Sequence, residues 1–358
     1  MNKRVLIQIC LITHLATNVA GQNDSLNVQV SKPDSSAESF GIFEDEELLE
    51  ITLRFDLSTY FRTKPKTEYL KANITFHLSE TDSLSRDIRL KTRGEFRNQN
   101  CYFAPIELNL KKVDFGYTDL DSIGKLKLVP ECQAGGGLNS NYVLREYLIY
   151  KLFNLLTDTS FRVRLLRINY IDTEKKRRPI SQYGFLIEPL DLLTTRTNSV
   201  AIKSPALTQR NVVPFVMDRL AIFNYMIGNY DYSLPGQHNV KVIKPLIVDP
   251  SVLAIAVPYD FDWTGFVNAE YAIPAENVGI ESIRERLFVG ICRTRETYEK
   301  ALEIFIGKKN EFYNLIDEFP YLNKREKRDM TLYLDEFYND TAGKKRILDI
   351  FLENCKKL

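Results

Sequence analysis

The stretch of residues 227–263 constrains this chain most, because it sets acidic side chains on both sides of a short apolar hairpin. The segment GNYDYSLPGQHN places Asp231 in a polar turn, with Asn239 eight residues later. A strand-like run comes next, and the segment VPYDFDW then supplies Asp260 and Asp262. Because the two ends of a hairpin lie side by side, the spacing predicts that these four side chains gather in one place.

Carboxylates in this order suit phosphoryl transfer, which needs one carboxylate beside the attacking hydroxyl and oxygen ligands that hold Mg²⁺ against the phosphates. Asp231 is the candidate catalytic residue, and Asn239 and Asp260 are the candidate metal ligands. Asp262 is either a second carboxylate ligand or a structural hydrogen-bond acceptor. The competing interpretation of Asp231 is that it caps the turn, where aspartate is common. His238 is expected to be structural.

A cation for the phosphates is expected on a strand of the N-terminal half. Lys127 in KLKLV is the first candidate, with Lys125 on the same face of the strand, and Lys91 is the competitor. The helix expected after KLKLV offers Glu146 as the ion-pair partner of the lysine. Arg93 begins the turn RGEFR, which could close over phosphates because arginine binds them in a bidentate manner. A solvent-facing strand position remains the alternative for each lysine.

Composition limits the class of protein. The 358 residues are 44% hydrophobic and 27% charged, as in ordinary soluble globular proteins. The formal net charge is +1, so we expect no nucleic acid as the main partner. No segment after the N-terminal one is long and apolar enough to cross a bilayer, so no membrane span is expected in the mature chain.

The N-terminus has the pattern of an export signal. Residues 1–21 combine a basic start, an apolar stretch and small residues before a cleavage point, which is typical of a secretory signal peptide. Residues 22–40 are polar and predict a disordered leader. We therefore expect a periplasmic, cell-surface or extracellular protein. Four cysteines remain after cleavage, and of these Cys101 and Cys132 form either a disulfide or free buried thiols.

Hydrophobic periodicity divides the rest of the chain in two. Residues 41–188 predict a β-rich N-lobe with one helix at 141–156 and strands at 48–55, 71–78, 87–92, 106–110, 125–129, 161–171 and 183–187. Residues 189–358 predict a mainly helical C-lobe that carries the hairpin, with helices at about 214–227, 280–291, 294–317, 322–338 and 341–355. The expected fold is α+β, with two lobes and a ligand cleft between them.

Four parts of the chain resemble the spore-coat-protein-H (CotH) kinase family, an atypical branch of the protein-kinase-like fold. They are LKTRGEFRNQNCYFAPIELNL, KLKLVPECQ with NSNYVLREYLIYKLFNLL, QYGFLIEPLD, and GNYDYSLPGQHNVKVI with AVPYDFDWTG, all within roughly residues 85–270. The resemblance implies a bilobal protein-kinase-like fold and transfer of a phosphoryl group from ATP to a protein hydroxyl. It would make Asp231 the catalytic residue and Asn239 and Asp260 the Mg²⁺ ligands, and it would place Glu188 at the hinge near the adenine.

Two other functions fit the same residues. A chain that kept only the fold would be a non-catalytic binding or scaffold protein at the cell envelope. A metal-dependent hydrolase of phosphate esters would use Asp231, Asp260 and Asp262. The acceptor protein and the true nucleotide, ATP or another, are not determined by the sequence.

Overall fold

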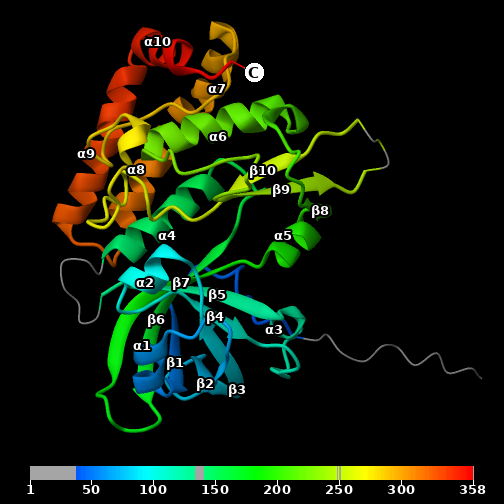
Figure 1. The fold of residues 1–358 in the computed structure, drawn as a ribbon, viewed down its shortest axis with the longest axis vertical. Helices are drawn as coiled ribbons and strands as arrows, with labels where there is room; N and C mark the ends of the chain where they lie inside the picture. Colours follow the sequence, from blue (N-terminus) through cyan, green and yellow to red (C-terminus); the bar gives the residue numbers. More distant parts are fainter. Residues whose placement is uncertain (1–37, 134–140, 248, 250, 358) are drawn as a thin grey trace, which may run out of the picture. The chain divides into compact units, whose positions relative to one another are not determined.

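A computed structural model describes residues 38–133, 141–247, 249 and 251–357, and Figure 1 shows their fold. Seven strands of this part close into a barrel, in the order β1-β2-β3-β4-β5-β7-β6. Neighbouring strands are antiparallel except β1 and β6, which are parallel. The strands are β1 (Leu49–Phe55), β2 (Leu70–His77), β3 (Ser83–Thr92), β4 (Ile106–Asn109), β5 (Lys125–Pro130), β6 (Val163–Asp172) and β7 (Ile180–Ile187).

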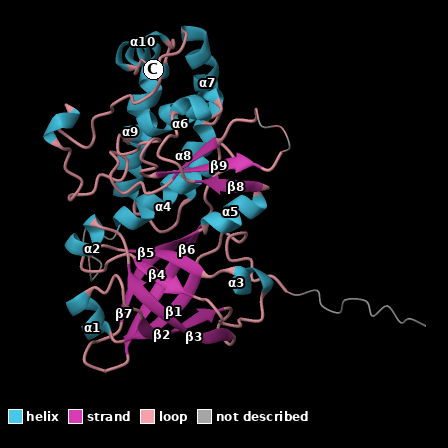
Figure 2. Ribbon diagram, turned by 45° about the vertical axis from the view of Figure 1, so that its right-hand side comes forward, coloured by secondary structure: helices cyan, strands magenta, loops and turns pink. Residues whose placement is uncertain are grey.

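Alternating apolar residues build the barrel, because every second side chain of a strand points to the same face. The clearest case is β1, in which Leu49, Ile51, Leu53 and Phe55 are all buried, as their spacing predicts. The inward-facing side chains form a hydrophobic core of their own. Figure 2 shows these strands in magenta, apart from most of the helices.

The expected bilobal protein-kinase-like fold, with one helix in a β-rich N-lobe and a mainly helical C-lobe, is wrong. The N-terminal strands close into a barrel because β1 pairs with β6, with Leu49 opposite Leu166 and Phe55 opposite Asp172. The pairing joins strands far apart in the sequence, so the alternation within each strand could not reveal it. The same half also contains three helices of five to seven residues, which are too short to show a helical period: α1 (Leu57–Thr63), α2 (Phe96–Asn100) and α3 (Thr118–Ser122).

The helix predicted at 141–156 is present as α4 (Asn141–Asn154), and 10 of its 14 residues are buried. It packs against β6 and β7 of the barrel and against α8 of the C-terminal half. Leu148 of α4 and Phe185 of β7 belong to the larger of the hydrophobic cores, together with the C-terminal helices. The burial of α4 on most of its sides, including Arg145 and Glu146, is therefore explained by its position between barrel and helices.

A second sheet, of three strands, lies in the C-terminal half in the order β10-β9-β8. The predicted hairpin is confirmed by the antiparallel pairing of β9 with β10. The remaining strand, β8, spans only four residues and was not predicted, so this half is less purely helical than expected. The elements here are α5 (Leu190–Arg196), β8 (Ser199–Ile202), the 3-10 helix η1 (Gln209–Asn211), α6 (Pro214–Ile227), β9 (Val240–Pro245), β10 (Ile255–Pro258) and the 3-10 helix η2 (Glu276–Val278).

The helix before the hairpin, α6, begins and ends where the sequence predicts. Pro214 is the first helical residue, and Gly228 ends the helix in the left-handed conformation, with φ of 66°. A Cβ atom at Gly228 would also collide with the hydroxyl of Tyr333. The glycine therefore allows both the turn toward Asp231 and the close approach of the C-terminal helices.

Four helices complete the fold: α7 (Arg295–Gly307), α8 (Lys309–Glu318), α9 (Lys324–Thr341) and α10 (Lys345–Asn354). The single helix expected at 294–317 is divided at Lys308, directly after a glycine, which is a poor helix former. The helix expected at 280–291 is wrong, since these residues form an irregular segment. Its buried residues Ile283, Phe288 and Ile291 are spaced by five and three positions, which does not make a continuous helical stripe.

Two disulfides join the four cysteines, Cys101 to Cys132 and Cys292 to Cys355. Of the two alternatives for Cys101 and Cys132, the disulfide is therefore present in the structure, and free buried thiols are not. The predicted signal peptide and residues 22–37 of the predicted leader lie outside the described residues. The end of that leader is ordered, because Phe40 packs against Phe76 and Tyr117 and its N–H donates to Asp119. Within the described ranges, no helix has the length and apolar character needed to span a membrane.

Candidate functional site

A cavity of about 730 Å³ opens between the turn after β3 and the two ends of the β9–β10 hairpin. Its volume is within the range of small-molecule sites. The predicted site residues that line it are Arg93, Asp231, Asn239, Asp260 and Asp262. Lys127, Glu146 and Glu188 are not among its lining residues. Segments from both halves of the chain therefore meet at one hollow, and their assigned roles there remain predictions.

The candidate metal ligands Asn239 and Asp260 stand at the two ends of the hairpin in left-handed backbone conformations, with φ of 52° and 65°. Such angles are uncommon outside glycine, so surrounding contacts must hold them. The N–H of Tyr259 donates to the carbonyl of Asn239 at 3.0 Å, which ties the two ends together. The N–H of Asp260 donates to the hydroxyl of Tyr150, a residue of α4, at 2.8 Å. These bonds hold the backbone of both residues at the cavity wall.

Asp231, the candidate catalytic residue, is held by three neighbours. Its own N–H donates to Asn229 Oδ1 at 3.0 Å. Asn239 Nδ2 donates to the backbone carbonyl of Asp231 at 2.8 Å and to its Oδ2 at 3.1 Å. His238 Nε2 lies 2.9 Å from Asp231 Oδ1. The carboxylate is about one-third exposed, so it is oriented by the turn and still reachable from the cavity.

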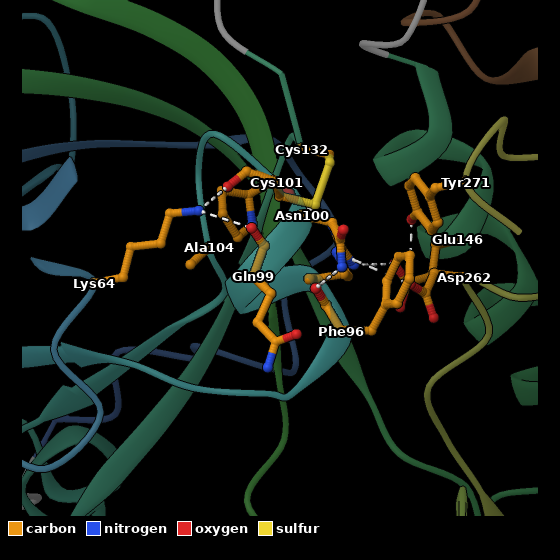
Figure 3. The surroundings of a disulfide bond; sticks show 12 residues. Lys64, Phe96, Gln99, Asn100, Cys101, Ala104, Cys132, Glu146, Asp262 and Tyr271 are labelled. Carbon is orange, nitrogen blue, oxygen red and sulfur yellow. Dashed lines mark hydrogen bonds and ion pairs between the residues drawn. A yellow bond between two sulfur atoms is a disulfide. The ribbon is translucent and has the colours of Figure 1, made fainter. Parts of the chain in front are cut away.

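Asp262 belongs to a buried ionic cluster beneath the cavity. Tyr271 donates its hydroxyl to Asp262 Oδ2 at 3.1 Å, and Arg97 Nε lies 3.9 Å from the same oxygen. Arg97 also donates to Glu146 Oε2 at 3.0 Å and to the carbonyl of Pro130 at 2.9 Å. Burial raises the pKa of both Glu146 and Asp262. Figure 3 shows Glu146, Asp262 and Tyr271 close together beside α2.

The expected ion pair between Lys127 and Glu146 is not among the salt bridges of the described residues. Glu146 pairs instead with Arg97 of α2. Lys127 projects from β5 toward Tyr259, which lines the cavity, and its ammonium lies 5.2 Å from the centre of that ring. Desolvation, together with the nearby cations Arg93 and Lys241, lowers the pKa of Lys127 to about 8. Lys127 thus lies at the edge of the cavity, without the carboxylate partner that was expected.

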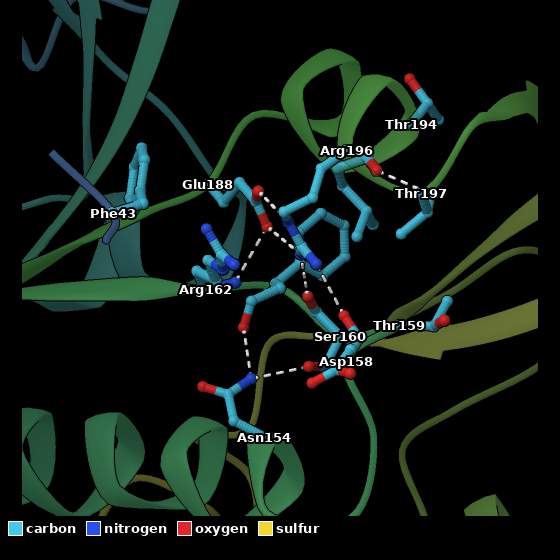
Figure 4. A network of polar contacts seen from close by, with 12 residues as sticks. Phe43, Asn154, Asp158, Thr159, Ser160, Arg162, Glu188, Thr194, Arg196 and Thr197 are labelled. Carbon is cyan, nitrogen blue, oxygen red and sulfur yellow. Dashed lines mark hydrogen bonds and ion pairs between the residues drawn. The ribbon is translucent and has the colours of Figure 1, made fainter. Parts of the chain in front are cut away.

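The hinge candidate Glu188 is buried and fully engaged in a structural network, which Figure 4 shows. Arg196 donates to both of its carboxylate oxygens, at 3.0 Å and 2.8 Å. The backbone N–H of Arg162 donates to Glu188 Oε2 at 3.0 Å. The carboxylate thereby fixes the junction between β7, β6 and α5. A role beside an adenine stays a prediction.

The side chains at the cavity supply only some of the oxygen ligands that a hard divalent cation needs. Among the described residues, no three or more His, Cys, Asp or Glu side chains form a group that could hold a metal. Mg²⁺ commonly takes just one or two carboxylates and completes its shell with water and substrate phosphates. Asn239 directs its amide nitrogen to Asp231, which leaves its amide oxygen as the end suited to a cation. Asn239 and Asp260, with Asp262 behind them, are therefore compatible with a Mg²⁺ that arrives with its phosphates.

Two residues of the site were missed or misjudged from the sequence. Arg97 was seen only as part of a turn, although it is the cation that neutralises Glu146. Lys241 was not considered, although its ammonium lies 4.7 Å from the ring centre of Tyr259. The signal that could have found Lys241 is its position two residues after Asn239, at the start of a strand that leaves the site.

Comparisons with known proteins give a distant likeness among solved structures. No protein-family model matches the chain, and no curated protein matches it. Among solved structures, the chain is similar to the crystal structure of a Helicobacter pylori proinflammatory kinase, CtkA, with a TM-score of 0.36 and 12% sequence identity. The match covers 78% of this chain and 90% of that chain. A likeness of this strength does not establish a shared fold or activity.

Proposed function

We propose that this chain is a Mg²⁺-dependent phosphotransferase that moves a phosphoryl group from a nucleotide, ATP or another, to a hydroxyl group of a protein. The observation that carries the proposal is a cavity lined both by side chains with oxygen donors and by an arginine. Asp231, Asn239, Asp260 and Asp262 line one part of it, and Arg93 lines another. Phosphoryl transfer is catalysed by positioning and charge stabilisation, and this arrangement offers both.

Each residue has a distinct part in the proposed reaction. Asp231 orients the acceptor hydroxyl and takes its proton, and His238 and Asn239 hold the carboxylate in place for that task. Asn239 and Asp260 hold the cation, which would neutralise phosphate charge and orient the transferred group. Arg93 contacts the phosphates. Arg97, which pairs with Glu146, lies close to Asp262 and supports the position of its carboxylate.

We also propose that the protein acts outside the cytoplasm, as the N-terminal pattern implies. Two disulfides among the described residues support this proposal, because such bonds persist mainly in oxidising compartments. A donor nucleotide would have to be available there. The acceptor remains unidentified.

The test is thermal unfolding of the full chain with ATP, ADP and GTP, each with and without Mg²⁺. A ligand that binds only the folded state stabilises it by roughly 2.7 kcal/mol at about a hundredfold excess over Kd. We expect a Mg²⁺-dependent rise in the transition that disappears in Asp260→Ala. Asp249→Ala is the matched control, because Asp249 lies in the turn at the far end of the same hairpin, where its side chain accepts hydrogen bonds from Ser251.

A second variant separates binding from catalysis. Asp231→Asn should keep the nucleotide-dependent rise and lose phosphoryl transfer to added protein acceptors. No rise with any nucleotide would contradict the proposal and favour a binding or scaffold protein. Release of phosphate from simple esters without an acceptor would instead favour a phosphoesterase.

A further inference from the structure

Two lysines from separate strands converge on one aromatic ring at the edge of the cavity, and an arginine lines the same cavity. The ammonium groups of Lys127, on β5, and Lys241, on β9, lie 5.2 Å and 4.7 Å from the ring centre of Tyr259. Arg93, which follows β3, lines the same cavity as Tyr259. An aromatic face attracts ammonium groups, so the ring holds the two lysines where they are.

Arg93, Lys127 and Lys241 differ from a neighbouring lysine, Lys125, in their ion pairs. Within the described part of the chain, none of the salt bridges includes Arg93, Lys127 or Lys241. By contrast, Lys125, two residues before Lys127 on the same strand, lies 3.0 Å from Glu107. Three like charges held near one another repel, and this arrangement is favourable when an anion sits between them.

The carboxylate that could compensate them has another part in the proposed reaction. Asp260 and Glu107 are the acidic groups that act on Lys127 through their charge. Glu107 already contacts Lys125 and Lys91. Asp260 would hold the metal ion, so little negative charge of the protein remains for this cluster. A chain of phosphates would supply negative charge to this cluster.

We infer that Arg93, Lys127 and Lys241 form a subsite for a polyphosphate chain, and that the protein recognises its donor by the phosphates more than by the base. The inference rests on the proposed function and gives it a substrate class. A nucleoside triphosphate and free inorganic triphosphate share this chemistry. The new assignment is Lys241, which comes from β9 and not from the strand that carries Lys127.

Calorimetric titration of the full chain distinguishes the sources. ATP, GTP and inorganic triphosphate are each titrated with Mg²⁺ present, and inorganic monophosphate serves as the short comparison. We expect ATP and GTP to bind with similar Kd values and inorganic triphosphate to compete with both. Lys241→Met should weaken all three by about tenfold or more, as expected for the loss of one charge-assisted contact. Lys241→Arg should retain most of the affinity, and Lys125→Met should retain it fully.

The outcomes separate this inference from the proposed function. If Mg²⁺ and nucleotide bind but Lys241→Met has unchanged affinity, or if ATP binds and GTP and inorganic triphosphate do not, the subsite is overturned while the phosphotransferase stands. If inorganic triphosphate binds through Lys241 and no nucleotide does, the subsite stands and nucleotide-dependent transfer fails. If no polyphosphate binds to a wild-type protein that is folded by circular dichroism, the subsite is overturned.

Discussion

At the scale of single residues, Glu131 shows what burial does to a carboxyl group in this chain. It follows β5 and is only 3% exposed. The backbone N–H of Tyr183 donates to its Oε1 at 3.1 Å. Burial raises the pKa of Glu131 from 4.5 to about 7, although this hydrogen bond and Arg167 act in the opposite direction. The folded protein therefore favours the protonated acid.

The sign of the resulting pH dependence follows from that shift. The stability that neutral Glu131 contributes is complete below about pH 4.5 and is lost as the pH rises through about 7. Glu131→Gln keeps the acceptor for Tyr183 and cannot ionise. We expect its advantage over wild type in free energy of unfolding to grow between pH 5 and pH 8 by roughly 2–3 kcal/mol.

Urea unfolding at both pH values measures this advantage. Glu80→Gln, at an exposed glutamate, is the control and should leave the pH dependence unchanged. An advantage of Glu131→Gln that is the same at pH 5 and pH 8 would contradict the prediction.

The oxygen donors of the site could be predicted from sequence because they lie within one local motif. Asp231, Asn239 and Asp260 stand at the ends of a hairpin whose turns and strands are all visible in residues 227–263. The partner of Glu146 could not be found in this way. Arg97 reaches it from a different segment, and which of several basic residues meets a buried acid depends on tertiary packing.

At the scale of elements, local features could likewise be predicted from the sequence, and features that depend on tertiary packing could not. The helix α6 carries its own start and stop signals, Pro214 and Gly228, and both this helix and the β9–β10 hairpin were predicted correctly. The closure of the barrel depends on which strand lies beside β1, and no residue of β1 specifies that partner. Helices as short as α2 follow from contacts made around them, and the sequence period cannot show them.

The short helix α2 depends on the disulfide at its end. Cys101 ends the helix, its N–H donates to the carbonyl of Arg97, and Cys132 follows β5. Lys64 Nζ donates to the carbonyl of Cys101 at 2.8 Å, as Figure 3 shows. The helix in turn carries Phe96 and Arg97, both of which line the cavity. The bond therefore fastens one wall of the site to the barrel.

Removing each disulfide should separate stability from ligand binding. The bonds span 31 and 63 residues, so each should contribute about 4 kcal/mol to the free energy of unfolding by the chain-entropy estimate. Cys101→Ser/Cys132→Ser should also weaken Mg²⁺–nucleotide binding, because α2 loses its anchor. Cys292→Ser/Cys355→Ser is the matched control, since it ties the segment before α7 to the end of α10, and its affinity should match wild type.

Titration below the unfolding transition of each variant gives the comparison. Equal loss of affinity in the two double variants would show that the effect is general destabilisation and not the loss of the α2 anchor.

At the scale of the whole molecule, two hydrophobic cores share the barrel wall. One lies inside the barrel and contains Leu90. The other contains Phe185 of the barrel, Leu148 of α4 and residues of α6 to α10 such as Tyr333. A division into lobes at residue 188 stays a prediction. Because the strands of the barrel wall contribute to both cores, separating the halves would expose a large apolar surface to water.

We therefore expect the described fold to unfold in one cooperative transition. Leu148→Ala and Leu90→Ala each remove a fully buried side chain, one from each core. Each should lower the free energy of unfolding by about 3 kcal/mol. Two probes report on different regions: fluorescence of Trp263, the only tryptophan, at the cavity, and hydrogen exchange of β2 and β3 amides in the barrel. If the cores are coupled, each variant lowers by the same amount the free energy of unfolding measured by Trp263 fluorescence and that measured by hydrogen exchange. The reason is that neither half stays folded without the other. If Leu90→Ala accelerates exchange in the barrel while the Trp263 transition stays in place, the barrel unfolds independently, and the cavity at its rim would then open without loss of the helical half.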